Sequence, residues 1–480
     1  MKAYFVSYIL GLAWLVLGAA ALAFAALAWL LGESPRGFLF TATLGLGLGL
    51  LLRARSSASD EPKTAEALVA SGLLWLALPI LAAVPYIVEA GFSPLDALFE
   101  AVSGFTTTGA SVLVDYQSFP QSLFIWRGLS QWVGGIGVTV LFVTVFPQLA
   151  VAGRQLFFSE ATGVQKEKLT PRLRQTASAV LKVYLALTAF TIAGYLAGGM
   201  SFYEAVGNAL GTIPTGGYSV NSSSFMNYSP LVLWIATIAM FLGATNLILQ
   251  YRVISERKSR WLLTDPEFRA YFGIVAVVGL MISAVIFTNH DYSWAQSLTH
   301  GFFQTVSIIS GTGFASQDFG IWVQPAQALL LLLMLVGGSA GSAAGGFKVV
   351  RWLLIFRHAV RELKRTLHPH AVLPLRYGTR NVGDDVLRSL FAFAALYFST
   401  LVIGALVLAL VEGDLVTAIS ASAVCLANVG VGLGNVGPSA SFAELQPVSK
   451  VVLIFQMWAG RLELIPVFLL FYPETWRSLR

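Results

Sequence analysis

Long apolar runs alternate with short polar segments along the whole chain. About 20 apolar residues suffice to cross the hydrocarbon core of a bilayer, so the runs predict ten membrane spans. The first run follows a single lysine, lacks a small-residue cleavage site and is too long for a signal peptide, so we expect it to remain as a span. The runs cover residues 4–31, 37–52, 68–90, 123–146, 180–198, 231–250, 271–288, 326–349, 389–411 and 451–472.

Four shorter, half-apolar segments interrupt this pattern. Each begins with a serine or an aspartate and is too short to cross the membrane, which predicts a capped half-helix. Asp96 and Glu204 stand three residues after their caps and complete a capping-box pattern in the first two. The expected half-helices are Ser93–Phe105, Ser201–Thr212, Ser297–Ile309 and Asp414–Leu426.

Each half-helix leads into a strip rich in glycine and threonine, and each strip has one key glycine sixteen residues after the cap. The key glycines are 109, 217, 313 and 430. The order of span, half-helix, strip, span and basic connection recurs in the same direction four times, which indicates internal repeats. We predict an N-terminal helical pair at 1–66, followed by repeats at 67–148, 149–262, 263–372 and 373–480.

The position of the strips predicts the architecture. Non-helical backbone at membrane depth is tolerated only inside protein or along a water-filled cavity, so the strips are expected to converge on one axis. Four coincident matches argue against ordinary surface loops. The predicted fold is an all-α integral membrane protein, with four parallel helix–pore-helix–helix repeats around a pseudo-fourfold pore and the extra N-terminal pair.

The residues of the strips suit a desolvated cation. Glycine allows successive carbonyl groups to turn to one side, and rings of carbonyl and hydroxyl oxygens can replace the hydration shell of potassium. Because the strips are not identical, we expect weaker binding than in a filter with fourfold identity. The candidate potassium ligands are Thr107, Thr108, Gly109, Thr215, Gly216, Gly217, Gly311, Thr312, Gly313, Asn428, Val429 and Gly430.

Composition and charge support a membrane protein and predict its orientation. Hydrophobic residues make up 56% of the chain, charged residues 11%, and Cys425 is the single cysteine, which excludes a disulfide framework. Of 30 Lys and Arg residues, 26 lie at the termini or in residues 53–66, 148–182, 251–269 and 348–388, which are therefore expected in the cytoplasm. The opposite connections are acidic and predict a cation-attracting outer mouth, although solvated caps are an alternative.

Two further features could control a pore. Residues 336–347 hold five glycines, and each glycine inside a helix costs about 1 kcal/mol relative to alanine, which favours a break. The alternative is a tightly packed helix with Gly337, Gly341 and Gly345 on one face. Arg461 lies inside the last apolar run, where a charge costs roughly 2.5–3.5 kcal/mol, so it is a functional candidate. Its alternative role is structural, either as an ion pair with Glu463 or as a donor that satisfies backbone carbonyls.

With its four strips, the glycine-rich segment and Arg461, the chain resembles the Trk/Ktr/HKT superfamily of potassium transporters over essentially its whole length, and within it the TrkH group of membrane subunits. The resemblance implies a homodimer in the bacterial cytoplasmic membrane, with one pore per protomer, docked on a cytosolic nucleotide-binding regulatory ring of the TrkA type. It implies potassium as cargo, no cofactor in this chain, and Gly109 favouring potassium where a serine would favour sodium. It also implies a gate made of Arg461 and an intramembrane loop with Gly337, Gly338, Gly341, Gly345, Gly346 and Lys348.

Other classes of protein fit less well. An enzyme within the membrane would need paired acids, a Ser–His pair or a metal cluster in its spans, and the spans contain almost no such groups. The G-x-G-x-x-G pattern at 432–437 lacks the strand and helix of a dinucleotide site. Transporters with inverted repeats differ in the direction of their repeats. Ion-coupled potassium symport and sodium permeability within the same superfamily stay open at this point.

Overall fold

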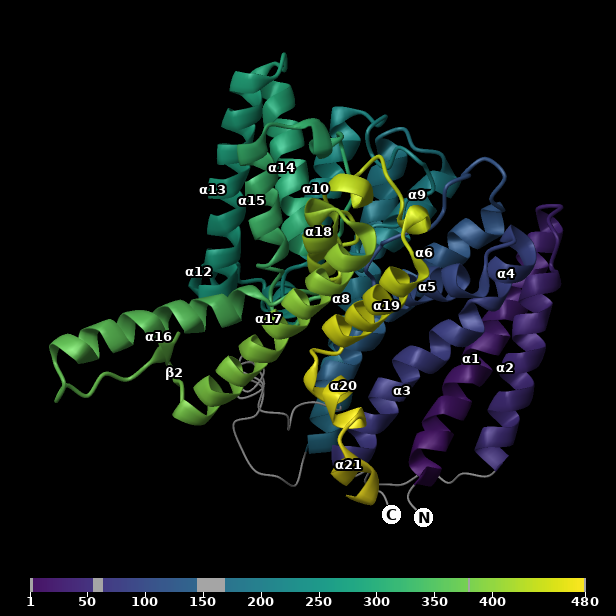
Figure 1. The fold of residues 1–480 in the computed structure, drawn as a ribbon, viewed down its shortest axis with the longest axis horizontal. Helices are drawn as coiled ribbons and strands as arrows, with labels where there is room; N and C mark the ends of the chain where they lie inside the picture. The colour runs from purple at the N-terminus through teal and green to yellow at the C-terminus, as the bar shows by residue number, and fades with distance from the viewer. Residues whose placement is uncertain (1–2, 55–63, 145–168, 379, 479–480) are drawn as a thin grey trace.

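The computed structural model describes residues 3–54, 64–144, 169–378 and 380–478 (Figure 1). Nearly all regular structure in these residues is helical, which confirms the all-α prediction. The regular strands of the described part form one short antiparallel pair, β1 (Arg376–Tyr377) and β2 (Arg380–Asn381). The boundary predicted at residue 148 and much of the basic segment 148–182 lie outside the described residues.

An N-terminal pair of helices precedes four units of the same order, each with a long helix, a half-helix and a second helix. The pair is α1 (Ala3–Leu30) and α2 (Arg36–Ala54). The first unit has α3 (Thr64–Ala82), α4 (Val84–Ala90), α5 (Pro94–Phe105) and α6 (Gln121–Thr144). The second has α8 (Leu169–Ala197), α9 (Phe202–Thr212), α10 (Pro230–Gly243), α11 (Leu247–Glu256) and α12 (Arg260–Thr264).

The third unit has α13 (Pro266–Asn289), α14 (Trp294–Ser310), η2 (Phe319–Ile321), α15 (Gln324–Met334) and α16 (Val349–Leu367). The fourth has α17 (Asp384–Glu412), α18 (Leu415–Leu426), η3 (Gly434–Val436), η4 (Phe442–Glu444), α19 (Pro447–Arg461), α20 (Ile465–Leu470) and α21 (Pro473–Ser478). α16 projects sideways from the bundle, and the β1–β2 pair follows it (Figure 1).

Three of the four half-helices begin where the sequence predicts. Ser93, Ser201 and Asp414 cap α5, α9 and α18 with their side chains. The prediction for the third is wrong, because α14 begins one turn earlier. Ser293 and Gln296 form a complete capping box there, and Ser297 is buried in the first turn of the helix.

Several of the ten predicted spans are interrupted. In the described residues, six helices are long and apolar enough to cross a membrane, or seven if the bent pair α10–α11, with its angle of 99°, counts as one span. The runs 231–250 and 451–472 break in the middle, so the prediction of continuous spans is wrong for them. The run 326–349 breaks as its five glycines predict, and the packed-helix alternative is excluded because residues 335–348 are not helical.

The break between α10 and α11 and the break between α15 and α16 form hydrogen bonds with each other's backbone groups. The N–H groups of Ser339 and Ala343, in the segment between α15 and α16, donate to Ala244 and Gly243 where α10 ends, at 2.9 and 3.2 Å. In return, the first N–H of α11, at Leu247, donates to the Gly341 carbonyl at 3.1 Å. Unpaired backbone groups are costly in a membrane, so the two breaks depend on each other. We call residues 335–348 the intramembrane loop.

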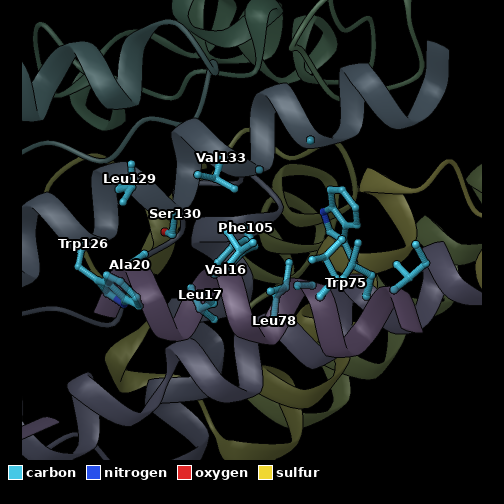
Figure 2. Close-up of a pocket in the computed structure, with 16 residues that line it drawn as sticks. Val16, Leu17, Ala20, Trp75, Leu78, Phe105, Trp126, Leu129, Ser130 and Val133 are labelled. Carbon is cyan, nitrogen blue, oxygen red and sulfur yellow. The ribbon is translucent and has the colours of Figure 1, made fainter. Parts of the chain in front are cut away.

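Helix α1 packs beside the helices of the first unit. Between α1, α3, α5 and α6 lies an apolar cavity of about 460 Å³, drawn in Figure 2. Phe105, at the end of the first half-helix, and Gly134 of α6 belong to its wall. The N-terminal pair therefore lies against the helices that carry the first strip.

Glycines in the second helices allow close contact with the ends of the half-helices. A Cβ on Gly134 of α6 would lie 2.0 Å from the Phe105 carbonyl oxygen, and one on Gly460 of α19 would lie 2.0 Å from that of Leu426. A Cβ on Gly243 of α10 would lie 2.7 Å from the Ile213 oxygen. No side chain fits between these backbones, so glycine is required here.

The variant Gly134→Ala is expected to lower stability, because its methyl group must push α5 and α6 apart. Overpacking of this kind costs about 1–3 kcal/mol. Thermal unfolding in detergent measures the effect. Gly47→Ala is the matched control, since Gly47 is also helical and has open space around it. Equal midpoints for the two variants would contradict the close contact.

Candidate ion pore

The four strips meet in a closed ring. A Cβ atom on each key glycine would collide with the carbonyl oxygen of the residue that precedes the key glycine in the next strip. The distances are 2.1 Å from Gly109 to Gly216, 1.8 Å from Gly217 to Thr312, 2.0 Å from Gly313 to Val429 and 2.1 Å from Gly430 to Thr108. The last contact returns to the first strip, so the four strips surround one axis. We call the carbonyl oxygens of Thr108, Gly216, Thr312 and Val429 the ring oxygens.

The strips share a backbone conformation that sequence reasoning anticipated only in part. Every key glycine is left-handed, with φ between 77° and 83°. The residue two positions earlier is left-handed as well, although it is a glycine only in the third strip. The values are 50° for Thr107, 55° for Thr215, 78° for Gly311 and 55° for Asn428. Such strain in residues other than glycine costs of order 1–3 kcal/mol and is concentrated at functional sites.

The backbone N–H groups of the strips are held by the half-helices. The residue that carries each ring oxygen donates its own N–H to the carbonyl five residues earlier. These bonds join Thr108 to Ser103, Gly216 to Gly211, Thr312 to Ser307 and Val429 to Val424, at 2.8–2.9 Å. The amides are therefore used by the helix ends, and the ring oxygens belong to peptides that the half-helices hold in place.

Two buried oxygens in the strips lack a hydrogen-bond partner. They are Oγ1 of Thr107 and Oδ1 of Asn428, both on residues that are completely buried. Buried polar atoms are normally paired with protein, water or an ion. Both residues occupy the first left-handed position of their strips, and the Asn428 oxygen lies beside Gly345 of the intramembrane loop, within 3.0 Å of a Cβ there.

A polar cavity of about 440 Å³ opens above the ring. All four key glycines belong to its lining, together with serine and asparagine side chains of the outer connections. The four strips thus form the floor of a single hollow. Glu444 is the one acid among the described residues that line it.

Most outer acids are structural, contrary to the expected acidic mouth. Glu33 accepts from the N–H groups that begin α6, and Glu89 accepts from the Gly37 N–H of α2. The hydroxyl and N–H groups of Thr417 lower the pKa of the Asp414 carboxyl group below its ordinary value. The alternative of capping groups therefore accounts for most of these residues, and the cavity depends mainly on neutral polar groups.

A buried ion pair lies behind the first and second strips. Arg127 of α6 contacts Glu100 of α5 at 2.7 Å, and both side chains are at most 1% exposed. Glu100 also accepts from Ser111 and from the Val112 N–H, and the Arg127 guanidinium lies 4.0 Å from the centre of the Tyr218 ring. The sequence carried a signal for this pair, because Arg127 lies inside a predicted span, where a charge needs a partner.

The variant Glu100→Gln is expected to destabilise the protein, since it leaves the buried Arg127 charge without a counterion. Breaking such a pair costs about 3–5 kcal/mol. Chemical unfolding in detergent micelles measures the loss. Asp385→Asn is the control, because Asp385 pairs with Arg388 on an exposed surface. A shift no larger than that of the control would show that the contact between Glu100 and Arg127 does not stabilise the fold.

The intramembrane loop lies directly against the strips, on the side of Asn428. A Cβ on Gly345 would lie 2.7 Å from the Ala427 oxygen and 3.0 Å from Oδ1 of Asn428. The Asn428 amide in turn donates to Thr108 and to the backbone of α19. The loop therefore contacts the fourth strip without a gap. The predicted gate residues Gly337, Gly338, Gly341, Gly345, Gly346 and Lys348 all lie in this non-helical segment.

Arg461 ties the loop to two helices. Its guanidinium donates to the Ala343 carbonyl at 2.9 Å and to the Gly134 carbonyl of α6 at 3.5 Å, and the side chain is 2% exposed. Of its two structural alternatives, the ion pair with Glu463 is not formed, because Glu463 binds Arg351 of α16 instead. The other alternative, bonding to backbone carbonyls, is formed. Arg461 thus contacts the loop from the last residue of α19.

Glu267 is a second anchor that the sequence did not reveal. Its Oε1 accepts from the N–H groups of Ala340 in the loop and Val350 in α16, at 2.8 and 3.2 Å. Arg351 also donates to the Phe347 carbonyl at the end of the loop. The loop is therefore held by α13 and α19, which are distant in sequence, and by α16, which follows it directly.

Comparison with known proteins identifies the relationship. The family described as TrkH, cation transport protein, matches residues 38–478. The chain belongs to this TrkH family. It is 33% identical over 423 residues to the Trk system potassium uptake protein TrkH of Escherichia coli K12, covering 87% of each chain. It is 35% identical over 422 residues to the Trk system potassium uptake protein TrkG of the same strain, covering 87% of this chain and 86% of that one.

The fold comparison agrees. The crystal structure of the potassium transporter TrkH from Vibrio parahaemolyticus superimposes with a TM-score of 0.90 at 30% identity, covering 99% of this chain and 100% of that chain. This confirms the resemblance to the TrkH group and the helical membrane fold with its repeated units. The TrkH relatives are transporters, which places this chain in a class of membrane transport proteins.

Proposed function

We propose that this chain takes up potassium across the bacterial cytoplasmic membrane, with the ring of four strips as its selectivity filter. The observation that carries the proposal is the closed series of contacts from each key glycine to the next ring oxygen. A ring of carbonyl oxygens replaces the hydration shell of a cation. The names of the relatives, which are potassium uptake proteins, support potassium as the cargo.

The proposed path begins in the polar cavity above the ring. A hydrated cation loses water there, binds among oxygens of the twelve strip residues predicted as ligands, and then meets the intramembrane loop and Arg461 as a gate. The negative ends of the four half-helix dipoles favour a cation at the axis. The membrane potential drives the ion inward with about 2.3 kcal/mol per charge per 100 mV.

The proposed assembly is a homodimer with one pore per protomer, docked on a cytosolic nucleotide-binding ring of the TrkA type. Basic residues concentrate in 148–182, 251–269 and 348–388, which we place in the cytoplasm together with both termini. α16, within the last of these segments, projects from the bundle and provides a surface for such a partner (Figure 1). Its first residues adjoin the intramembrane loop, so a force on α16 reaches the gate.

Flux measurements test this function. Purified protein in liposomes is expected to pass potassium and rubidium faster than sodium under an imposed membrane potential. Expression is expected to restore growth of cells deficient in potassium uptake on low potassium. Uptake that required a proton or sodium gradient would support ion-coupled transport instead, and equal sodium flux would contradict a potassium filter.

A further inference from the structure

The second strip lacks a side chain where the other three have one. Thr108, Thr312 and Val429 carry the ring oxygens of the first, third and fourth strips, whereas the second has Gly216. The Thr108 hydroxyl bonds to that of Thr106, and the Thr312 hydroxyl to that of Ser310, each at 2.7 Å. Gly216 has no side chain that could hold its peptide group in this way.

A residue of the first unit occupies the vacant space. A Cβ on Gly216 would lie 2.5 Å from Cδ of Gln131, a fully buried residue of α6. The Gln131 Nε2 donates to the Gly216 ring oxygen at 2.6 Å, and its Oε1 accepts from the Tyr218 N–H at 3.1 Å. One side chain therefore bridges the residues on both sides of the key glycine, Gly217.

We propose that Gln131 is the positioning residue that sets the selectivity of the second strip, a role that rests on the proposed filter. A carbonyl oxygen has two lone pairs, so that of Gly216 can accept from Gln131 and still face a cation. The Gly216 ring oxygen is the one that lies against Gly109, the key glycine of the first strip. Without Gln131 the Gly216 carbonyl loses its side-chain donor, and only the bonds of the Gly216 and Gly217 N–H groups to Gly211 still restrain this peptide. Glycine accepts both hands of φ, so the carbonyl is then held less firmly than those of the other strips. The ring oxygens then move inward and bind sodium, which is the smaller ion. An oxygen ring that is held at the spacing suited to potassium disfavours sodium.

Potassium and sodium flux in liposomes, measured with three variants, tests the proposal. Gln131→Ala is expected to lower the potassium-to-sodium ratio about fivefold, the effect of about one lost buried hydrogen bond. Gly216→Thr is expected to lower it as well, because the new side chain collides with Gln131. The double variant is expected to regain part of the ratio, since the threonine side chain then fills the space that Gln131 has vacated. Recovery is not complete, because Pro214 offers no hydroxyl where Thr106 and Ser310 stand in the other strips.

A further variant keeps the test decisive if Gly216→Thr fails to fold. Gln131→Glu retains an acceptor for the Tyr218 N–H but loses the donor to the Gly216 oxygen, so its ratio is expected to fall. A wild-type ratio in both Gln131→Ala and Gln131→Glu would overturn the proposal. A double variant no better than the worse single variant would overturn it too.

Gln456→Ala is the matched control. Gln456 of α19 is equally buried, but its amide group donates to Thr400 of α17 and Ser422 of α18 and not to any residue of a strip. Its loss is expected to leave the ratio unchanged, and an equal fall would show that packing alone explains the effect and overturn the proposal. A selective wild type with unaffected Gln131 variants would refute this inference alone, whereas a wild type without potassium flux would refute the proposed function with it.

Discussion

Gly109→Ser is expected to abolish most of the preference for potassium over sodium. The backbone of Gly109 is left-handed, with φ of 82°, and its Cβ would lie 2.1 Å from the Gly216 ring oxygen. A left-handed conformation costs a residue with a Cβ roughly 1–2 kcal/mol. The serine Cβ also collides with the Gly216 ring oxygen, which has to move away. The potassium-to-sodium flux ratio in liposomes is therefore expected to fall by about tenfold or more.

Gly91→Ser separates the collision from the backbone strain. Gly91 ends α4 with φ of 67°, and a Cβ there meets no atom within 4 Å. This control is expected to lose some stability and to keep the wild-type flux ratio. If sodium is excluded equally before and after Gly109→Ser, the ring is not the filter.

Arg461→Ala is expected to raise potassium flux. The substitution removes the bond to the Ala343 carbonyl, which is one of the anchors of the intramembrane loop, and it removes a positive charge from the proposed path. A full charge within about 10 Å of a cation, at an effective dielectric constant of about 20, changes a barrier by roughly 1–2 kcal/mol, or about tenfold in rate. Flux in liposomes at equal protein density measures the change.

Two further variants distinguish the loss of the positive charge from the loss of the hydrogen bond to the loop. Arg461→Lys keeps the charge with fewer donors, and Arg461→Gln keeps donors without the charge. Flux that rises only with Gln and Ala would indicate electrostatic control, and flux that rises with Lys as well would indicate a tether. Lys450→Ala is a control on the same helix, since Lys450 pairs with Asp96 and not with the loop. Unchanged or lower flux in Arg461→Ala would remove this residue from the gate.

Local patterns predicted most of the fold. The apolar runs identified the helices, and Ser93, Ser201 and Asp414 marked the starts of three half-helices, because capping depends on residues only three positions apart. The third start was missed by four residues, since Ser293 and Ser297 both have the character of a cap and only the bond to Gln296 distinguishes them. The breaks near residues 245 and 462 escaped prediction, because their helix ends are satisfied by contacts made far away in sequence.

The sequence by itself determined that this is a membrane protein of four parallel repeats with a glycine at one equivalent position in each strip. Hydropathy, helix caps and glycine positions are local properties, so the sequence alone reveals them. The tertiary structure alone decided which oxygen faces which glycine, that Arg461 binds Ala343 and not Glu463, and that Gln131 fills the space at Gly216. These contacts join residues dozens to hundreds of positions apart, and only the packing of the repeats brings them together.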